Sequence, residues 1–134
     1  MKKKKTILII DDHPLLREGL KVVIARDKRY EVIAEAGDGK EGIRLIKKVK
    51  PDIVLVDISL PDMNGIDLLH QIRKRFPEIK LMVVSMHSKI DYITESFRAG
   101  ALGYLAKEAA ATSLIKGLDT ISRGEYFLDS SISK

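Results

Sequence analysis

Five short, largely apolar segments recur along the chain, and each is followed by a more polar stretch. Runs of consecutive apolar residues bounded by turn formers are typical of strands that are buried on both faces of a sheet. The second segment instead alternates apolar and polar residues, but it is rich in residues that favour strands. We therefore predict five strands, at residues 6–10, 30–36, 53–56, 79–84 and 102–105.

The stretches between these segments carry apolar residues at helical spacing. In the first stretch, Leu16, Leu20 and Ile24 lie four residues apart and would form one apolar stripe. Pro14 suits the first turn of that helix, and a Pro or Gly lies just beyond the end of each later one. The predicted helices run from residue 14 to about 27, from the turn at 37–39 to 50, and over 65–75, 91–98 and 109–123.

Strands of this buried kind, alternating with helices through short connections, indicate a parallel sheet made of right-handed crossovers. Such a sheet has helices on both faces, because each crossover helix covers one of them. The sequence contains no internal repeat. The predicted fold class is therefore α/β, with one sheet between two layers of helices.

Composition adds limits rather than a function. With 134 residues, 45% of them hydrophobic and 32% charged, the chain predicts one ordinary globular domain. The absence of cysteine excludes disulfides and thiolate metal sites. No apolar run has the length of a membrane span or of a signal peptide core, so we expect a cytoplasmic protein with no membrane partner.

The net charge of +5 is concentrated in residues 2–5, which are all lysine, and the remainder is nearly neutral. We interpret residues 1–5 as a flexible basic leader and residues 6–125 as the folded domain. Residues 126–134 are polar and serine-rich, which is typical of the start of a linker. No zinc-finger or helix-turn-helix pattern follows the leader, so its charge does not indicate direct DNA binding.

Polar side chains follow four of the predicted strands. Asp11 and Asp12 come after the first, Asp57 after the third and Ser85 after the fourth, and the fifth strand runs into Lys107. In an open α/β sheet the carboxyl ends of the parallel strands meet at one edge, where functional residues are placed. We therefore expect these five side chains to lie close together.

Carboxylates brought together repel one another unless a cation lies between them. Oxygen ligands favour a hard divalent ion, Mg²⁺ or Mn²⁺, over zinc. Acids, a lysine and a hydroxyl group around such an ion suit phosphoryl transfer. Asp57 would then be the nucleophile that becomes an aspartyl phosphate, Asp11 and Asp12 would hold the metal, and Lys107 and Ser85 would bind phosphate oxygens. Alternatively, Asp57 merely ends its strand and Asp11 and Asp12 cap the first helix.

The motifs that contain these residues resemble, in order, those of bacterial response-regulator receiver domains. They are Asp11-Asp12-His13, Asp57 with Pro61-Asp62-Met63-Asn64-Gly65, Ser85-Met86-His87, and Gly103-Tyr104-Leu105-Ala106-Lys107. The resemblance covers about residues 5–125. Residues 12–20, together with the motif at 85–87, resemble the NarL/FixJ branch, whose members usually carry a C-terminal helix-turn-helix DNA-binding domain.

The resemblance implies a flavodoxin-like (βα)5 three-layer sandwich with a parallel five-stranded sheet of order 2-1-3-4-5. It implies that a sensor histidine kinase phosphorylates Asp57 and that the domain can form a homodimer on phosphorylation. The chain would be no enzyme beyond catalysing its own phosphorylation and dephosphorylation. DNA would be bound only through a C-terminal domain beyond residue 134, and the alternative is a stand-alone receiver that acts by protein–protein interaction.

Carried over position by position, the resemblance also implies a ligand set. Asp12 and Asp57 would be direct magnesium ligands, Asp11 would act largely through bound water, and the backbone carbonyl of Ser59 would be the other protein ligand.

Ser85 and Tyr104 match the family's switch pair, in which the hydroxyl moves toward the phosphate and the ring turns inward. Many receivers have a proline after the lysine, in a cis peptide, whereas Glu108 stands here. Because a cis bond before a non-proline residue costs about 3 kcal/mol, we expect a trans bond. His13 and His87 have no partner at metal spacing, so we do not expect them to be ligands or phosphoacceptors.

Other classes fit less well. A flavodoxin needs a phosphate loop rich in Ser, Thr or Gly after the first strand, where Asp11 and Asp12 would repel a phosphate. A haloacid-dehalogenase phosphatase needs a second acid two residues after its nucleophile, and Ser59 stands there after Asp57. A receiver-like module that binds partners without being phosphorylated stays open. Asp62 and Asn64 are better interpreted as turn formers than as ligands.

Overall fold

The computed structural model of the protein describes residues 3–132. Its centre is one parallel sheet of strand order β2-β1-β3-β4-β5-β6. The order of the first five strands confirms the predicted fold class. The strands are β1 (Lys5–Ile10), β2 (Tyr30–Ala36), β3 (Ile53–Val56), β4 (Lys80–Ser85), β5 (Gly103–Ala106) and β6 (Phe127–Leu128).

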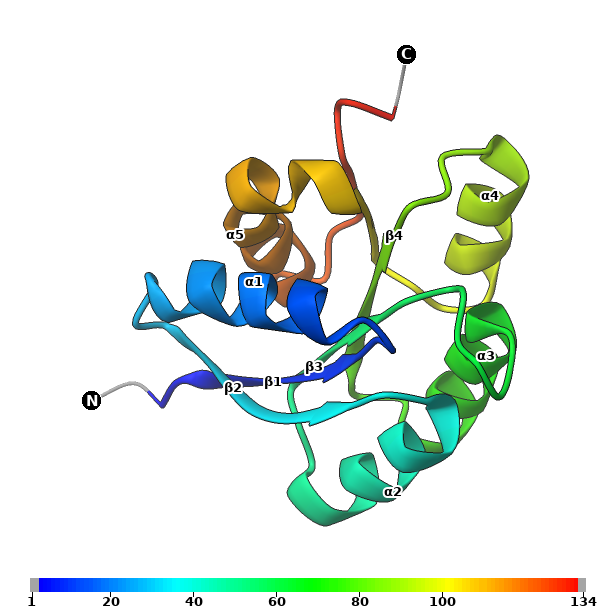
Figure 1. The fold of residues 1–134 in the computed structure, drawn as a ribbon, viewed down its shortest axis with the longest axis horizontal. Coiled ribbons are helices and arrows are strands. Elements are labelled where there is room, and N and C mark those ends of the chain that lie inside the picture. Colours follow the sequence, from blue (N-terminus) through cyan, green and yellow to red (C-terminus); the bar gives the residue numbers. More distant parts are fainter. Residues whose placement is uncertain (1–2, 133–134) are drawn as a thin grey trace.

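Helices cover both faces of the sheet. They are α1 (Pro14–Ala25), α2 (Gly39–Val49), α3 (Gly65–Arg75), α4 (Ile90–Arg98) and α5 (Ala110–Ser122), with a 3₁₀ turn η1 (Lys107–Ala109) before α5. Helices α1 and α5 lie on one face, and α2, α3 and α4 lie on the other (Figure 1). This three-layer arrangement is the one expected from the alternation of strands and helices.

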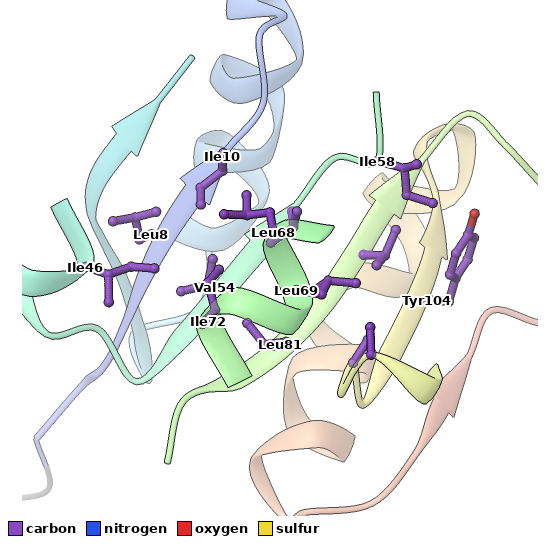
Figure 2. Close-up of a cluster of buried hydrophobic side chains, with 14 of the residues drawn as sticks. Leu8, Ile10, Ile46, Val54, Ile58, Leu68, Leu69, Ile72, Leu81 and Tyr104 are labelled. Carbon is purple, nitrogen blue, oxygen red and sulfur yellow. The ribbon is translucent and has the colours of Figure 1, made fainter. Parts of the chain in front are cut away.

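The two sheet faces form two separate hydrophobic clusters. Leu20 of α1 and Leu118 of α5 pack against one face. On the other face, Leu68, Leu69 and Ile72 of α3 are fully buried and lie across the strands, as Figure 2 shows. All four residues of β3 are buried, because this central strand is covered on both sides. The sheet is therefore a rigid platform for the loops at its edge.

Local sequence signals fix the helix ends. The carboxylate of Asp38 accepts a hydrogen bond from the N–H of Glu41 at the start of α2, and the side chain of Asn64 accepts one from Ile66 at the start of α3. Helix α1 begins with Pro14 after His13, whose side chain makes no capping hydrogen bond. Within residues 3–132 no helix is long and apolar enough to cross a membrane.

The prediction of a five-stranded sheet was wrong in one respect, because the chain adds β6 beside β5. Residues 127–128 lie in the segment that we interpreted as the start of a linker. The outer edge of β5 would leave unpaired backbone groups, and β6 pairs with them in parallel. The ring of Phe127 packs over Gly117 of α5, where an added Cβ atom would lie 3.0 Å from the ring. Residues 1–2 of the predicted leader and 133–134 of the predicted linker lie outside the described residues.

Candidate functional site

The carboxyl ends of the central strands meet at one edge of the sheet and bring the predicted residues together. Ser85, the last residue of β4, pairs with Ala106, which directly precedes Lys107. The ammonium group of Lys107 contacts Asp57 after β3 and Asp11 after β1. Four strand ends therefore contribute to one site, as the sequence pattern predicted.

Asp57 is held at the end of β3. Its backbone N–H donates to the carbonyl of Ile10 in β1 at 3.0 Å. One carboxylate oxygen accepts a hydrogen bond from the N–H of Ser59 at 3.1 Å, and the other accepts one from Lys107 Nζ at 3.1 Å. Only 2% of the residue is exposed to solvent. Its carboxylate is thus fixed in position and desolvated.

Gly65 packs against the backbone of Asp57 and Ile58. Its N–H donates to the carbonyl of Ile58 at 2.7 Å, which closes the loop between β3 and α3. A Cβ atom at residue 65 would lie 2.3 Å from the backbone oxygen of Asp57. The loop therefore approaches so closely that only glycine fits.

The loop after β1 supplies two more acids. Asp11 is 2% exposed, and one of its oxygens accepts hydrogen bonds from the backbone N–H of His13 at 2.8 Å. The same oxygen lies 2.9 Å from Nδ1 of the His13 ring, and an oxygen of the half-buried Asp12 lies 3.1 Å from that nitrogen. The two acids therefore do not cap α1, which was the alternative interpretation.

Among the described residues, Lys107 is the only lysine or arginine whose side chain forms ion pairs with the carboxylates of Asp11 and Asp57. Its Nζ lies 3.1 Å from Asp57, 3.2 Å from Asp11 and 3.3 Å from Nδ1 of His13. Burial, followed by the negative charge of Asp11, raises the pKa of Asp57 above its ordinary value. The N–H of Ser59 and the charge of Lys107 oppose that rise without cancelling it.

The donor set fits a hard divalent cation. Carboxylate oxygens of Asp11, Asp12 and Asp57 and a nitrogen of His13 all lie within 4.8 Å of one another. Mg²⁺ prefers oxygen ligands and retains several water molecules, so three carboxylates at an open edge suit it. Burial, followed by the charge of Asp11, raises the pKa of Asp57, so a cation beside this carboxylate would stabilise its ionised form.

Ser85 and Tyr104 contact the same loop from neighbouring strands. The fully buried Ser85 hydroxyl accepts a hydrogen bond from the N–H of His87 at 2.9 Å. The hydroxyl of Tyr104, also fully buried, donates to the carbonyl of His87 at 2.8 Å. Figure 2 shows the ring of Tyr104 at the margin of the buried cluster, with its hydroxyl directed toward the site edge of the sheet.

His87 joins two loops of the site. Its Nε2 lies 2.9 Å from the hydroxyl of Ser59, and its ring lies over that of Tyr92 with 4.6 Å between centroids. Sequence reasoning placed neither contact, because the two loops are far apart along the chain. The peptide bond between Lys107 and Glu108 is trans, as predicted, since residues 3–132 contain no cis peptide bond.

Arg17 was missed by sequence reasoning although it supports the site. Its guanidinium group donates to the backbone carbonyl of Asp11 and to Glu35 of β2, the latter at 2.9 Å. Lys21 holds Glu35 from the next turn of α1 at 2.6 Å. A basic residue one turn after Pro14 is an ordinary helix-surface pattern, so no sequence signal indicates this contact.

Asp62 and Asn64 are turn and cap residues, as interpreted from the sequence. The carboxylate of Asp62 accepts hydrogen bonds from the N–H groups of Gly39 and Lys40 at 2.9 and 3.0 Å. It thereby ties the loop after β3 to the start of α2. Neither side chain lies in the cluster of acids.

A parallel α/β sheet with three acids and a lysine at its carboxyl edge is a pattern that can be compared with families of known proteins. The family model described as "Response regulator receiver domain" matches residues 7–119. The chain belongs to this family, as its motifs indicated.

Two curated relatives place the chain within the family. It is 38% identical over 125 residues to the transcriptional regulatory protein DegU of Brevibacillus brevis, an alignment covering 93% of this chain and 53% of that protein. It is 34% identical over 128 residues to the nitrate/nitrite response regulator protein NarL of Escherichia coli K12, covering 96% and 59%. The chain thus spans little more than half the length of these relatives.

Solved structures agree. A two-component response regulator of the LuxR family from Aurantimonas has a TM-score of 0.92 at 33% identity, with 98% of this chain and 94% of that one covered. The isolated receiver domain of RcsB from Salmonella enterica has a TM-score of 0.91 at 25% identity, covering 98% and 97%. The chain is the receiver domain of a response regulator of the NarL/LuxR type, a group of regulators rather than enzymes acting on metabolites.

Proposed function

We propose that Asp57 accepts a phosphoryl group from the phosphohistidine of a sensor histidine kinase. The observation that carries this proposal is the buried Asp57 carboxylate with Lys107 Nζ at 3.1 Å and the acids of the β1 loop beside it. In the transfer, an Asp57 oxygen forms a bond to phosphorus while the bond from phosphorus to the histidine nitrogen breaks, and the imidazole leaves.

The residues of the chain divide this work between them. The N–H of Ser59 holds one oxygen of Asp57 and thereby orients the other toward the incoming group. Lys107 lies where it neutralises charge on a transferred phosphoryl oxygen. Only the ionised Asp57 is a nucleophile, so its raised pKa makes the reaction slower as pH falls through that pKa.

Asp11, Asp12 and Asp57 would hold Mg²⁺ or Mn²⁺, with the backbone carbonyl of Ser59 as the remaining protein ligand. The carboxylates within 4.8 Å of one another support this assignment. When bound, the ion supplies positive charge that offsets the acids and the phosphoryl oxygens.

Ser85 and Tyr104 are proposed as the switch. Both contact His87, so a shift of the Ser85 hydroxyl toward a phosphoryl oxygen would release the N–H of His87 and change the loop that Tyr104 holds. An added phosphoryl group brings negative charge and acceptor oxygens to this point. The result is a change in the surface formed by α4 and β5.

The output is proposed to be transcriptional, through a C-terminal helix-turn-helix domain outside this chain. The names of DegU and NarL as regulators, and solved RcsB complexes with DNA, support this assignment. The proposed partners are therefore a sensor kinase and, on phosphorylation, a second copy of the receiver. DNA would be contacted only through the other domain, and the protein would act in the cytoplasm.

Incubation with acetyl phosphate and Mg²⁺ tests the proposal, with the phosphorylated form separated on a phosphate-affinity gel. The wild type should be labelled, and the labelling should stop when EDTA removes the metal. Asp57→Asn should not be labelled, whereas the matched Asp62→Asn, in the same loop, should be. Equal labelling of wild type and Asp57→Asn, or no labelling of either, would refute the proposed phosphoacceptor.

A further inference from the structure

Asp129 is a buried acid outside the acid cluster, and the function proposed above does not use it. It is 1% exposed, and its carboxylate accepts three hydrogen bonds. The N–H and hydroxyl of Ser131 donate to its two oxygens, both at 3.0 Å. The third donor is the backbone N–H of Ala106 at 3.2 Å. A buried carboxylate with this many donors is a specific feature of the fold.

The segment that carries Asp129 follows β5 residue by residue. Phe127 donates its N–H to the carbonyl of Leu102, and Asp129 donates its own to the carbonyl of Tyr104, at 2.8 and 3.1 Å. The side chain of Asp129 then continues this ladder to Ala106, beyond the point where backbone pairing stops. Residues 127–131, which we call the tail strap, are thus bonded along the strand that bears Tyr104 and leads into Lys107.

Ala106 is the position through which the strap can act on the site. It is the last residue of β5, and Ser85 is its partner in β4. The next residue, Lys107, extends its ammonium group to Asp57 and Asp11. Strand β6 pairs with Gly103 and Tyr104 but does not extend to Ala106. The carboxylate of Asp129 binds the N–H of Ala106 instead, and so holds the backbone directly before Lys107.

A purely structural role is the competing explanation. In that case Asp129 would serve only to close the turn with Ser131 and to bury the strap. The hydrogen bond from the Ser131 hydroxyl fits a purely structural role, because both residues belong to the same turn. The bond to Ala106 does not, because it joins the turn to the strand end beside the proposed phosphoacceptor site.

We propose that Asp129 is a positioning residue for Lys107, and that docking of the tail strap and occupancy of the Asp57 site are coupled through this contact. The inference rests on the proposed phosphorylation of Asp57. Coupling of two sites is reciprocal, so an occupied site tightens the strap as much as a docked strap favours occupancy. The strap would thereby carry the state of the site to residues that follow it.

The first test needs no variant. Hydrogen exchange of the Ala106 and Asp129 amides is followed by NMR in the wild type, with Mg²⁺ alone and with Mg²⁺ and the phosphomimetic beryllofluoride. We expect exchange at both amides to slow by about tenfold when the mimic is bound. Unchanged exchange at these amides, with resonance shifts at Asp57 showing that the mimic is bound, would overturn the coupling.

The second test measures the rate of phosphorylation by acetyl phosphate. Asp129→Ala should lower this rate by about tenfold, because Lys107 is no longer held in place. The matched control is Ser131→Ala, which disturbs the same turn but keeps the bond from Ala106 to Asp129, and it should react at the wild-type rate. Equal slowing of the two variants would contradict the proposed role of Asp129.

A double-mutant cycle separates positioning from general loss of structure. In a Lys107→Ala background, Asp129→Ala should cause no further loss of rate, since the residue it positions is absent. The same loss in both backgrounds would assign Asp129 a structural role only. The two proposals fail differently: an unlabelled wild type removes the phosphoacceptor, whereas a labelled wild type with an unaffected Asp129→Ala removes only this inference.

Discussion

Replacing Asp57 with asparagine should make the metal-free protein more stable. The substitution keeps the size of the side chain and an oxygen that can accept the hydrogen bond from Ser59, but it removes a charge that is 2% exposed. The charge is unfavourable in the folded protein, because burial and Asp11 together raise the pKa of Asp57. Function and stability therefore conflict at this residue.

The distances set the size of the effect. With an effective dielectric constant of about 20, Lys107 at 3.1 Å attracts the Asp57 charge by about 5 kcal/mol. Asp11 and Asp12, each within 4.8 Å, repel it by about 3.5 kcal/mol apiece, less solvent screening at the half-buried Asp12. The cluster is thus about 1 kcal/mol repulsive before the cost of burial, and we expect Asp57→Asn to stabilise the fold by about 1–2 kcal/mol at pH 7.

Urea unfolding followed by far-ultraviolet circular dichroism measures this difference. In thermal unfolding the same gain would raise the melting temperature by about 4–8 °C. When the pKa of a carboxyl is higher in the folded than in the unfolded protein, the folded protein becomes less stable as pH rises. For Asp57 this loss begins near the ordinary pKa of 3.8 and is complete above the pKa in the folded protein. The advantage of Asp57→Asn should therefore be present at pH 7 and shrink as pH falls toward the ordinary range of an aspartate.

Two controls sharpen the result. Millimolar Mg²⁺ should stabilise the wild type more than Asp57→Asn, and so reduce the difference in unfolding free energy between the two proteins. Asp62→Asn should instead destabilise the fold. Desolvation alone would raise the pKa of the exposed Asp62, but hydrogen bonds from the backbone N–H groups of Gly39 and Lys40 outweigh it and lower that pKa. A metal-free Asp57→Asn that is less stable than the wild type at pH 7 would refute the electrostatic account of the cluster.

Three further substitutions test individual contacts that hold the scaffold together. Gly65→Ala should destabilise the fold by about 2–3 kcal/mol and abolish labelling by acetyl phosphate, because the new Cβ would lie 2.3 Å from the backbone of Asp57; wild-type stability in urea would contradict this. Tyr30→Phe should cost about 1 kcal/mol through the lost hydrogen bond to Asp119. Burial, followed by that hydrogen bond, raises the pKa of Tyr30 to about 12, so the wild type alone should lose this stability between pH 10 and 12, and parallel pH profiles would count against it. Asp38→Ala should cost about 1 kcal/mol by uncapping α2, without altering the labelling rate.

The main features of fold and site followed from the sequence because they rest on simple periodicities. Continuous apolar runs identified β1, β3 and β4, and the rule that parallel strands end at one edge placed Asp11, Asp57 and Lys107 together. Lys107, which directly follows β5, lies at that edge as expected, and the structure adds that its ammonium group contacts both acids.

The features that were missed depend on turn geometry and on single long-range contacts. The ring of His13 lies among the acids because its backbone N–H bonds Asp11, a turn that no periodicity indicates. Arg17 reaches the Asp11 carbonyl from the surface of α1. Strand β6 is two residues long, and the acid that anchors it, Asp129, is a residue type that usually indicates solvent exposure.

Mapping the phosphorylated residue tests the central claim most directly. After incubation with acetyl phosphate and Mg²⁺, borohydride reduces an aspartyl phosphate to a stable alcohol, and peptide mass spectrometry then locates it. Asp57 should be the modified residue, and the modification should be absent from samples treated with EDTA. Modification at Asp11 or Asp12 in place of Asp57, or no modification at any aspartate, would contradict the account.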